Sequence, residues 1–378
     1  MQNLGIIMMS SITSQFHIFL CGDVMTGRGV DQVLTHPCEP QIYESYVRDA
    51  RDYVRLAEQI NGSIPLHNKG EYVWGDALDE LNLRKPDLRL INLETSITSS
   101  DTPWPNKGIN YRMHPKNIDV ITAAHIDVCV LANNHVLDWG KEGLLETLLT
   151  LDKVGISYVG AGKNIQKATA PAILFVPGFK GRILVFSMGL SSSGILKEWA
   201  ATVEQPGVWL LPDLSKDTIK QIKKVIEHYR KAEDLCIVSI HWGGNWGYEI
   251  PLYHQRFAHR LIDQLGVHVI HGHSAHHPMG IELYNQGLIL YGCGDLINDY
   301  EGIGGWEQFK SELSLMYFLT FNAQGRLTQL ELVPMVRKNF KLHYASKDDG
   351  QWMAKNLTAC SRRFKTSFEF NNYVIHCL

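Results

Sequence analysis

The sequence lacks paired cysteines, long apolar runs and an excess of charge of either sign. Its seven cysteines are scattered singly along 378 residues with no Cys-x-x-Cys pair, a pattern typical of buried, reduced thiols. The net charge of −3 offers no polybasic footprint, so nucleic acid is not an expected partner. No internal repeat or linker-like composition divides the chain, which argues against several small domains.

The amino-terminal stretch is fairly apolar but lacks the basic leading region of a signal peptide. Residues 10–15 interrupt its apolar run before it is long enough to span a bilayer. The hydrophobic content of 45% and charged content of 20% are ordinary for a soluble globular protein. We therefore expect a cytoplasmic protein with a sizeable core and no membrane anchor in this chain.

Four histidines lie close together in residues 267–282, VHVIHGHSAHHPMGIE. A β-branched run leads into a turn that carries His271, His273, His276 and His277, which indicates a buried strand ending in a polar loop. Neutral imidazole is the commonest protein ligand for transition metals. A histidine-rich surface loop is the alternative interpretation.

Polar side chains also follow other strand-like runs. Asp23 follows residues 17–21, Glu94 follows 87–91, Asn133, Asn134 and His135 follow 127–132, and His241 follows 235–240. Amphipathic helices predicted at 142–153, 218–232 and 255–265 alternate with these strands. This β-α-β alternation favours parallel strands covered by helices, whose carboxyl ends share one edge. Asp23 taken alone is equally suited to capping the next helix.

Other segments bear on substrate and domain organisation. The loop at 99–112 contains Lys107 and Arg112, which suit an anionic or peptide-like substrate, although either is also explained as a solvated charge. Asn133, a polar residue without an ordinary core role, is a further candidate substrate contact. Residues 313–336 predict an antiparallel hairpin, and we expect specificity to lie in the loops at 31–80, 99–112 and 191–214.

In the order of its motifs the chain resembles the CapA-like branch of the calcineurin-like metallophosphoesterase superfamily, the capsule or poly-γ-glutamate synthesis proteins. The resemblance covers roughly residues 16–340. The motifs that carry it are Gly22-Asp23-Val24-Met25, Asn92-Leu93-Glu94, Ala132-Asn133-Asn134-His135 with Asp138 and Gly140, Gly160-Ala161-Gly162, His241-Trp242-Gly243, Gly272-His273-Ser274-Ala275-His276 and Ile281-Glu282.

The resemblance implies an α/β fold, a metallophosphoesterase-like four-layer sandwich of two mixed β-sheets flanked by helices. It implies one such domain at 16–340 and a carboxyl-terminal extension of a helix and a strand at 341–378. By position His135 and Asp23 would be catalytic, with His135 contacting the reacting group, and His271 and His277 would be structural or support the ligands. The implied metal ligands are Asp23, Glu94, Asn134, His241, His273 and His276.

The sequence also departs from the wider superfamily pattern. Met25 stands where a histidine usually follows the first aspartate, and Glu94 replaces a bridging aspartate. The histidines of the last block are three residues apart, His273 and His276, rather than two, and Asp295 stands where CapA-like proteins usually carry asparagine. These departures leave one or two metal ions as alternatives.

The implied ligand set favours Mn, Fe, Zn or Co, since it mixes carboxylate oxygen with imidazole nitrogen. Such an ion lowers the pKa of a bound water to about 7. The leading hypothesis is therefore a metal-dependent hydrolase of a phosphoester or of a glutamyl or peptide amide. Two alternatives stay open, a metal-dependent peptide epimerase and a non-catalytic accessory protein of poly-γ-glutamate synthesis.

Overall fold

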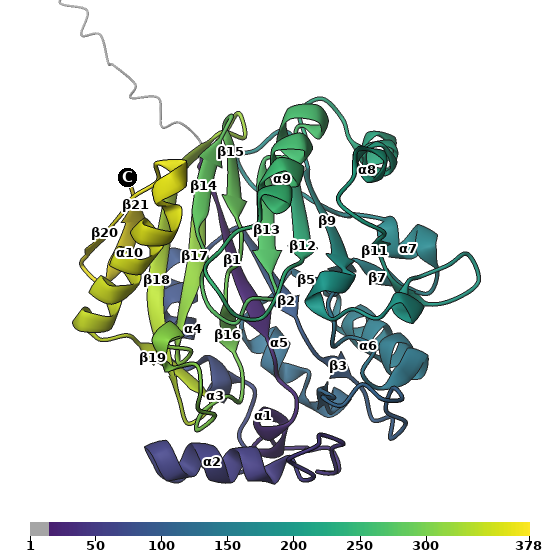
Figure 1. Ribbon diagram of the computed structural model, residues 1–378, viewed down its shortest axis with the longest axis vertical. Helices are drawn as coiled ribbons and strands as arrows, with labels where there is room; N and C mark the ends of the chain where they lie inside the picture. The colour runs from purple at the N-terminus through teal and green to yellow at the C-terminus, as the bar shows by residue number, and fades with distance from the viewer. Residues whose placement is uncertain (1–14) are drawn as a thin grey trace, which may run out of the picture.

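Two mixed β-sheets pack face to face, with helices on their outer faces (Figure 1). The computed structural model describes residues 15–378. The observed layers confirm the expected four-layer α/β sandwich. Residues 1–14, which contain most of the interrupted apolar run at the amino terminus, lie outside the described part of the chain.

The larger sheet has ten strands with the first strand near its centre. Its spatial order is β20 (Phe368–Asn371), β21 (Val374–Cys377), β18 (Leu327–Lys338), β17 (Leu313–Asn322), β1 (Gln15–Val24), β2 (Leu88–Leu93), β5 (Val128–Val130) and β6 (Ser157–Val159), with β16 (Asp295–Ile297) beside β1 and β19 (Lys341–Tyr344) beside β18. Strands β1, β2, β5 and β6 are parallel, as their alternation with helices predicts. The expected hairpin is confirmed by the antiparallel pair β17–β18.

The smaller sheet has seven strands and supplies the histidine-bearing strand ends. Its spatial order is β11 (Leu210–Leu211), β9 (Ile183–Leu190), β12 (Leu235–His241), β13 (Val269–His273), β15 (Gly287–Leu290) and β14 (Ile281–Tyr284), with β8 (Ala172–Leu174) beside β9. Two short pairs accompany the sheets, β3 (Ser96–Ile97) with β4 (Arg112–Met113) and β7 (Ala161–Gly162) with β10 (Gly207–Val208).

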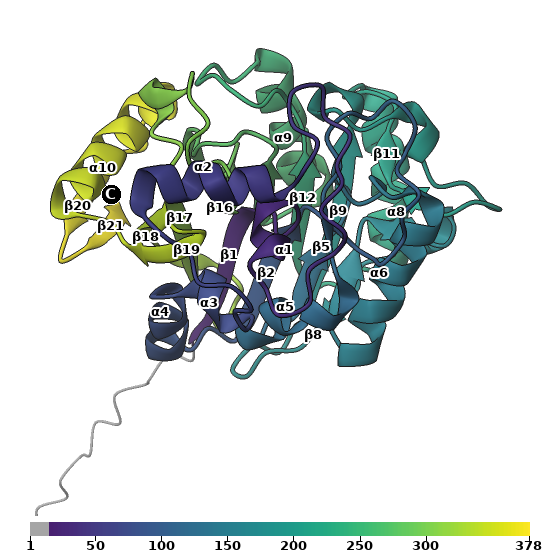
Figure 2. The same cartoon turned by 90° about the horizontal axis from the view of Figure 1, so that it is seen from below.

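Helices enclose the two sheets. The larger sheet is covered by α3 (Glu71–Trp74), α4 (Ala77–Arg84), α5 (Asp119–Ala123) and α6 (Gly140–Val154), and the smaller by α8 (Lys216–Tyr229) and α9 (Leu252–Leu265), while α7 (Ile165–Thr169) lies near β7 and α10 (Lys347–Ser361) packs on β20. Figure 2 shows α1 (Gly29–Gln32) and α2 (Arg51–Asn61) lying across the end of the molecule where β1 terminates.

The core sits between the sheets and follows the two-residue period of the strands. On β1, Ile18 and Leu20 point to the inter-sheet core with Ile237 of β12, whereas Phe19 and Cys21 pack with the helices on the other face. Because both faces of these strands are covered, their residues read as continuous apolar runs. Several buried polar side chains lie at the carboxyl ends of these strands, among them Asp23, His241 and His273.

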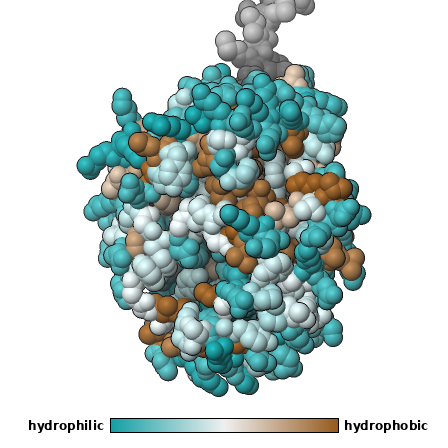
Figure 3. All heavy atoms as spheres, turned by 45° about the vertical axis from the view of Figure 1, so that its right-hand side comes forward, coloured by the Kyte–Doolittle hydropathy of each residue, from teal (hydrophilic) through white to brown (hydrophobic). Residues whose placement is uncertain are grey.

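The carboxyl-terminal residues continue the larger sheet, since β18 pairs with both β19 and β21. Residues 341–378 contain the expected helix and strand and two further strands, β19 and β20, while the domain boundary at residue 340 stays a prediction. Among residues 15–378, every helix is too short or too polar to cross a bilayer. On the face shown in Figure 3, hydrophobic residues form separate patches among hydrophilic ones.

Candidate metal centre

Strand ends from both sheets bring the candidate site residues together. Asp23 lies beside Asn92 of β2 and Asp295 of β16 in the strand register, and His241 lies opposite His273. Glu94, Asn134 and His135 follow the ends of β2 and β5. All six ligands implied by the resemblance therefore converge on one region, and their metal-binding role is a proposal taken up below.

One group of possible ligands consists of Asp23, His241 and His273. A ligand atom from each of these buried side chains lies within 4.8 Å of the others. The Nδ1 atoms of His241 and His273 are 2.7 Å apart, and His241 Nε2 is 3.0 Å from Asn134 Oδ1. One carboxylate oxygen and one nitrogen from each of the two imidazoles are thus close enough together to share an ion.

A second group consists of Asp23, His276 and Asp295, again within 4.8 Å of one another. His276 Nδ1 is 2.9 Å from Asp295 Oδ1, and Asn298 donates to Asp295 Oδ2 at 2.6 Å. Although burial opposes the charged form, the Asp295 carboxylate raises the pKa of His276. Asp23 belongs to both groups, so the arrangement suits either one ion or two ions bridged by Asp23.

The two carboxylates at the centre are crowded and share one donor. Asn92 donates from Nδ2 to Asp23 Oδ1 at 2.7 Å and to Glu94 Oε2 at 2.9 Å. Burial, with the charge of Asp295, raises the pKa of Asp23 to about 7. Burial and the charge of Asp23 also raise the pKa of Glu94 well above its usual value.

These residues fit a divalent metal. The second oxygen of Asp23, Oδ2, is buried without a hydrogen-bond partner, and such an atom costs free energy unless a cation or donor reaches it. A cation would also relieve the repulsion between the two carboxylates. Mixed carboxylate and imidazole donors match Mn, Fe, Zn or Co.

His135 lies beside this cluster and is held in one orientation. Its Nδ1–H donates to Asp138 Oδ2 at 2.6 Å, and the Tyr111 ring packs edge-on against it at 4.7 Å. Its Nε2 lies 3.9 Å from Glu94 Oε1. Burial lowers the pKa of His135 to about 4, so the imidazole is neutral at neutral pH with its lone pair on Nε2.

Lys107 lies at the edge of the same site. Its Nζ is 3.4 Å from Asp138 Oδ1, an oxygen without a hydrogen-bond partner of its own, and 5.6 Å from the Trp199 ring centroid. The side chain is only 9% exposed. Lys107 therefore places a positive charge beside His135 and its carboxylate partner.

Arg112 and Asn133, the other two expected substrate contacts, have protein partners instead. Arg112 donates to Asp101 and to two backbone carbonyls and stacks over Trp139. Asn133 is fully buried, donates to Asn92 Oδ1 and the Leu93 carbonyl, and accepts from two backbone N–H groups, including that of His135. Their contacts support the loops of the site, and a substrate contact by either residue stays a prediction.

His277 has a supporting position, as expected. Its Nε2 accepts from the Gly247 backbone N–H at 3.1 Å, and its ring stacks on Phe309 at 4.5 Å. These contacts hold the glycine-containing loop that follows β12 against the loop that follows β13.

Asn92 and Asp295 are site residues that the sequence reasoning did not assign. Asn92 lies two residues before Glu94, and the two-residue period of a strand places both on one face. The two-residue spacing therefore indicates from the sequence that Asn92 belongs to the same site as Glu94. Asp295 was noted only as a departure from the family pattern, because its pairing with His276 depends on contacts between distant segments.

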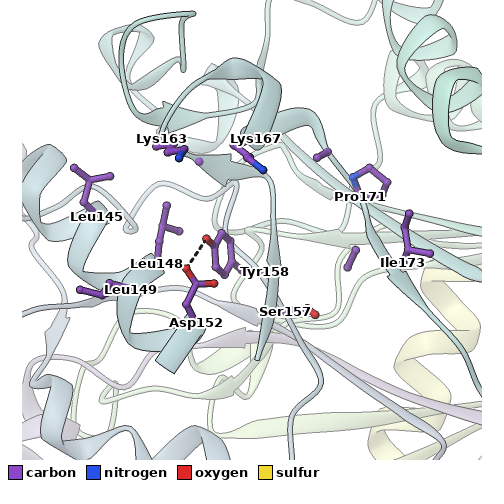
Figure 4. Close-up of a pocket in the computed structure, with 13 residues that line it drawn as sticks. Leu145, Leu148, Leu149, Asp152, Ser157, Tyr158, Lys163, Lys167, Pro171 and Ile173 are labelled. Atoms are coloured by element: carbon purple, nitrogen blue, oxygen red, sulfur yellow. Dashed lines mark hydrogen bonds between the residues drawn. The ribbon is translucent and has the colours of Figure 1, made fainter. Parts of the chain in front are cut away.

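A surface groove lies away from this site. A groove of about 690 Å³ runs between α6, β6 and β8, and Figure 4 shows Lys163 and Lys167 on one side with Leu145 and Leu149 on the other. Tyr158 donates to Asp152 at 3.3 Å within it. None of the candidate metal ligands lines this groove, so it is separate from the buried cluster.

Comparison with known proteins shows that the sequence is similar to capsule-related proteins. A family model described as bacterial capsule synthesis protein PGA_cap matches residues 17–300. The chain is 46% identical over 349 residues to a probable polyglutamine synthesis accessory protein of Mycobacterium tuberculosis, covering 92% of this chain and 91% of that protein. It is 25% identical over 317 residues to the capsule biosynthesis protein CapA of Bacillus anthracis, covering 84% and 66%. Among solved structures, the NAD nucleotidase of Haemophilus influenzae aligns with a TM-score of 0.42 and 14% identity, over 89% of this chain and 60% of that one.

Proposed function

Because the chain belongs to the bacterial capsule synthesis protein family PGA_cap, we propose that it is a metal-dependent hydrolase acting on a phosphoester or on a glutamyl or peptide amide. The observation that carries the proposal is the pair of ligand groups sharing Asp23 beside the Asp138-bound His135. Asp23, Glu94, Asn134, His241, His273 and His276 would hold one or two divalent ions, with Asp295 supporting His276.

When bound, a divalent ion polarises a carbonyl or phosphoryl oxygen and makes water acidic enough to attack near neutral pH. His135 is placed to move the proton. Because its Nδ1–H is used by Asp138, its Nε2 accepts a proton from the attacking water and returns it to the leaving group. Asp138, fixed by the Tyr111 backbone N–H at 2.7 Å, stabilises the charged imidazole formed in between.

The substrate we propose is anionic. Lys107 lies over the Trp199 ring, pairs with Asp138 and donates to the Ile109 carbonyl, each at 3.4 Å. Its positive charge therefore lies beside the His135–Asp138 pair. The names of the relatives mention polyglutamine synthesis and capsule biosynthesis. Together with the resemblance to poly-γ-glutamate synthesis proteins, whose polymer bears carboxylates, they support an anionic polymer as the substrate class. A phosphoester meets the same charge requirement.

A non-catalytic accessory role is the second candidate, and the name of the 46% identical relative favours it. In that case the same residues bind metal but turn over no substrate. The two candidates are separated by activity in the presence of metal, not by metal binding.

The test uses the full chain purified without chelator. We expect one or two divalent ions per chain by metal analysis, and metal-dependent cleavage of bis(p-nitrophenyl) phosphate or of γ-glutamyl p-nitroanilide that EDTA abolishes. His241→Ala and His273→Ala each lower turnover by about 100-fold or more, since they remove ligands. His228→Ala, on the exposed face of α8, is the matched control and keeps full turnover.

A protein that contains no metal and melts at the same temperature with and without EDTA contradicts the metal centre itself. Bound metal without turnover of either compound contradicts the hydrolase and favours the accessory role. Turnover that survives His273→Ala shows that catalysis occurs elsewhere.

A further inference from the structure

Two strands of the smaller sheet carry side chains that line up toward His273. In the parallel pair β12–β13, Ser239 lies opposite His271, and His241 lies opposite His273. Because side chains alternate along a strand, Ser239 and His241 share one face, as do His271 and His273. All four side chains are fully buried.

Hydrogen bonds connect these side chains in a line that crosses between the sheets. His271 Nε2 is 2.7 Å from the Cys21 carbonyl on β1, and His271 Nδ1 is 3.0 Å from Ser239 Oγ. Ser239 Oγ is in turn 2.7 Å from His273 Nε2. The line starts on the larger sheet, two residues before Asp23, and ends at a proposed ligand on the smaller sheet.

The proton positions along this line follow from hydrogen-bond chemistry. A carbonyl oxygen only accepts, so His271 carries its proton on Nε2. A buried imidazole whose ring nitrogens meet only a carbonyl and a hydroxyl is neutral, so its Nδ1 is bare and accepts the Ser239 hydroxyl proton. The hydroxyl has no second proton to give, so Ser239 Oγ accepts from His273 Nε2–H.

We propose that the Cys21 carbonyl, His271 and Ser239 act as a relay of positioning groups that fixes His273 with a bare Nδ1 facing the metal centre. The relay rests on the metal site of the proposed function and adds residues that do not themselves touch metal. Ligating histidines generally donate their second N–H to such a partner, which fixes the tautomer and the ring orientation.

The relay also determines which ring atoms face each other where His241 approaches His273. If His241 carries its proton on Nε2, toward Asn134 Oδ1 at 3.0 Å, its bare Nδ1 faces the bare Nδ1 of His273 at 2.7 Å. If the proton is on Nδ1 instead, the bare Nε2 faces the amide oxygen. With the Asn134 amide oxygen facing His241 Nε2, two lone pairs meet in either tautomer, and a shared cation would remove that repulsion.

The relay also ties ligands of the two sheets together. Asp23 comes from β1 and His273 from β13, and β1 has a register irregularity between Leu20 and Asp23, next to the Cys21 carbonyl that anchors His271. Loss of the relay therefore alters both the tautomer of His273 and its position relative to Asp23.

The test compares Zn²⁺ affinity of the metal-free full chain, measured by calorimetry, between Ser239→Ala and a matched control. Ser187 is the control, because it lies opposite Ser239 on β9, is equally buried and has a hydroxyl without a hydrogen-bond partner. We expect Ser239→Ala to weaken Zn²⁺ binding by about 10- to 100-fold, and Ser187→Ala to change it by less than about twofold.

A second pair of variants separates the relay from packing. His271→Gln keeps a donor for the Cys21 carbonyl and an acceptor for Ser239, whereas His271→Phe keeps the ring volume and loses both. We expect His271→Gln to bind Zn²⁺ more tightly than His271→Phe, and the Co²⁺ absorption spectrum of His271→Phe to differ from that of the parent.

The tautomer itself is measurable without metal or substrate. Long-range ¹H–¹⁵N spectra of the metal-free protein labelled in its histidines distinguish the two tautomers, and the variants above assign the signals. We expect His271 and His273 both as Nε2–H forms.

His273 found as the Nδ1–H form overturns the relay, as does Zn²⁺ affinity unchanged in Ser239→Ala or equally weakened in Ser187→Ala. These outcomes leave the proposed function standing if the parent protein binds metal and turns over substrate. A parent protein that binds no Zn²⁺ instead contradicts the metal centre on which the relay rests.

Discussion

Asp23 is the residue on which the two groups of possible ligands depend. It contributes to both groups, its Oδ1 is held by Asn92, and its Oδ2 is left without a partner. The sequence placed Asp23 after a strand but left capping of a helix as an equal alternative. The orphaned oxygen favours the metal-ligand interpretation, because a capping carboxylate would have its acceptors filled by backbone N–H groups.

Lys107 makes the substrate charge testable at the residue scale. We expect Lys107→Met to raise KM for an anionic substrate by about tenfold, the cost of roughly one lost ionic contact, with the metal content unchanged. Lys107→Arg keeps the charge and retains much of the affinity. The control is Lys163→Met in the separate groove, and steady-state kinetics on the same compound decides. Equal KM values in Lys107→Met and the parent would contradict the contact.

The helices and strands agree with their sequence patterns where one face is clearly apolar. Helices α6, α8 and α9 and the hairpin β17–β18 lie where their periodicity predicts. The spacing of apolar residues from Tyr46 to Ile60 predicts a helix there, whereas α2 begins at Arg51 and ends at Asn61. The residues before Arg51 form other contacts instead of a helix. Gln41 forms a β-bridge with Asp49, and the Asp49 carboxylate accepts from the Arg51 backbone N–H at 2.9 Å.

The turn before β13 carries a pH-dependent contribution to stability. His268 accepts from the Cys236 backbone N–H at 3.0 Å through Nδ1, and burial, with the charge of Arg230, lowers the pKa of His268 to about 4. Between this value and the unfolded value of about 6.5, the unfolded chain binds more protons at this residue. The stability it contributes is therefore present above pH 6.5 and lost as the pH falls toward 4.

We expect His268→Asn, which keeps an acceptor for Cys236 but does not titrate, to lose less stability than the parent between pH 7 and pH 5. One group of this kind contributes at most about 1.4 kcal/mol per pH unit within its window, so the difference is about 1–2 kcal/mol. Urea denaturation at both pH values measures it. Parallel losses in the two proteins would exclude His268 as a source.

At the scale of the whole molecule, Arg28 joins segments that are far apart in the sequence. Its buried guanidinium donates to Asp299 and Glu44 and stacks on Tyr53 and Tyr111 at 4.0 and 4.2 Å. Tyr111 in turn contacts His135. One cation therefore holds the segment around α2 against the site.

We expect Arg28→Met to lower the free energy of unfolding by about 3–5 kcal/mol, because it leaves the buried Asp299 and Glu44 carboxylates without their cationic partner. Arg55→Met, which removes a largely exposed pair with Asp52, is the control and costs about 0–1 kcal/mol. Urea denaturation compares the two. A loss in Arg28→Met no larger than in the control would show that the cluster adds nothing to stability.

The sequence by itself determined the α/β class and the alternation of parallel strands with helices, because these depend on local periodicity. The ligand set was implied by the family resemblance and stays a proposal. Asp138 lies in the same motif as His135, but their hydrogen bond was found only in the structure. Asn92 was within reach through the period of a strand.

Only the tertiary structure decided how distant segments meet. Four sets of contacts join residues from different elements. They are the pairing of Asp295 with His276, the hydrogen bonds of Arg28, the protein partners of Arg112, and the relay from Cys21 through His271 and Ser239 to His273. Such contacts depend on sheet register and on how the sheets pack together, and neither leaves a periodic mark in the chain. The sequence indicated the polar residues at each strand end separately, whereas their arrangement into one site depends on how the two sheets pack together.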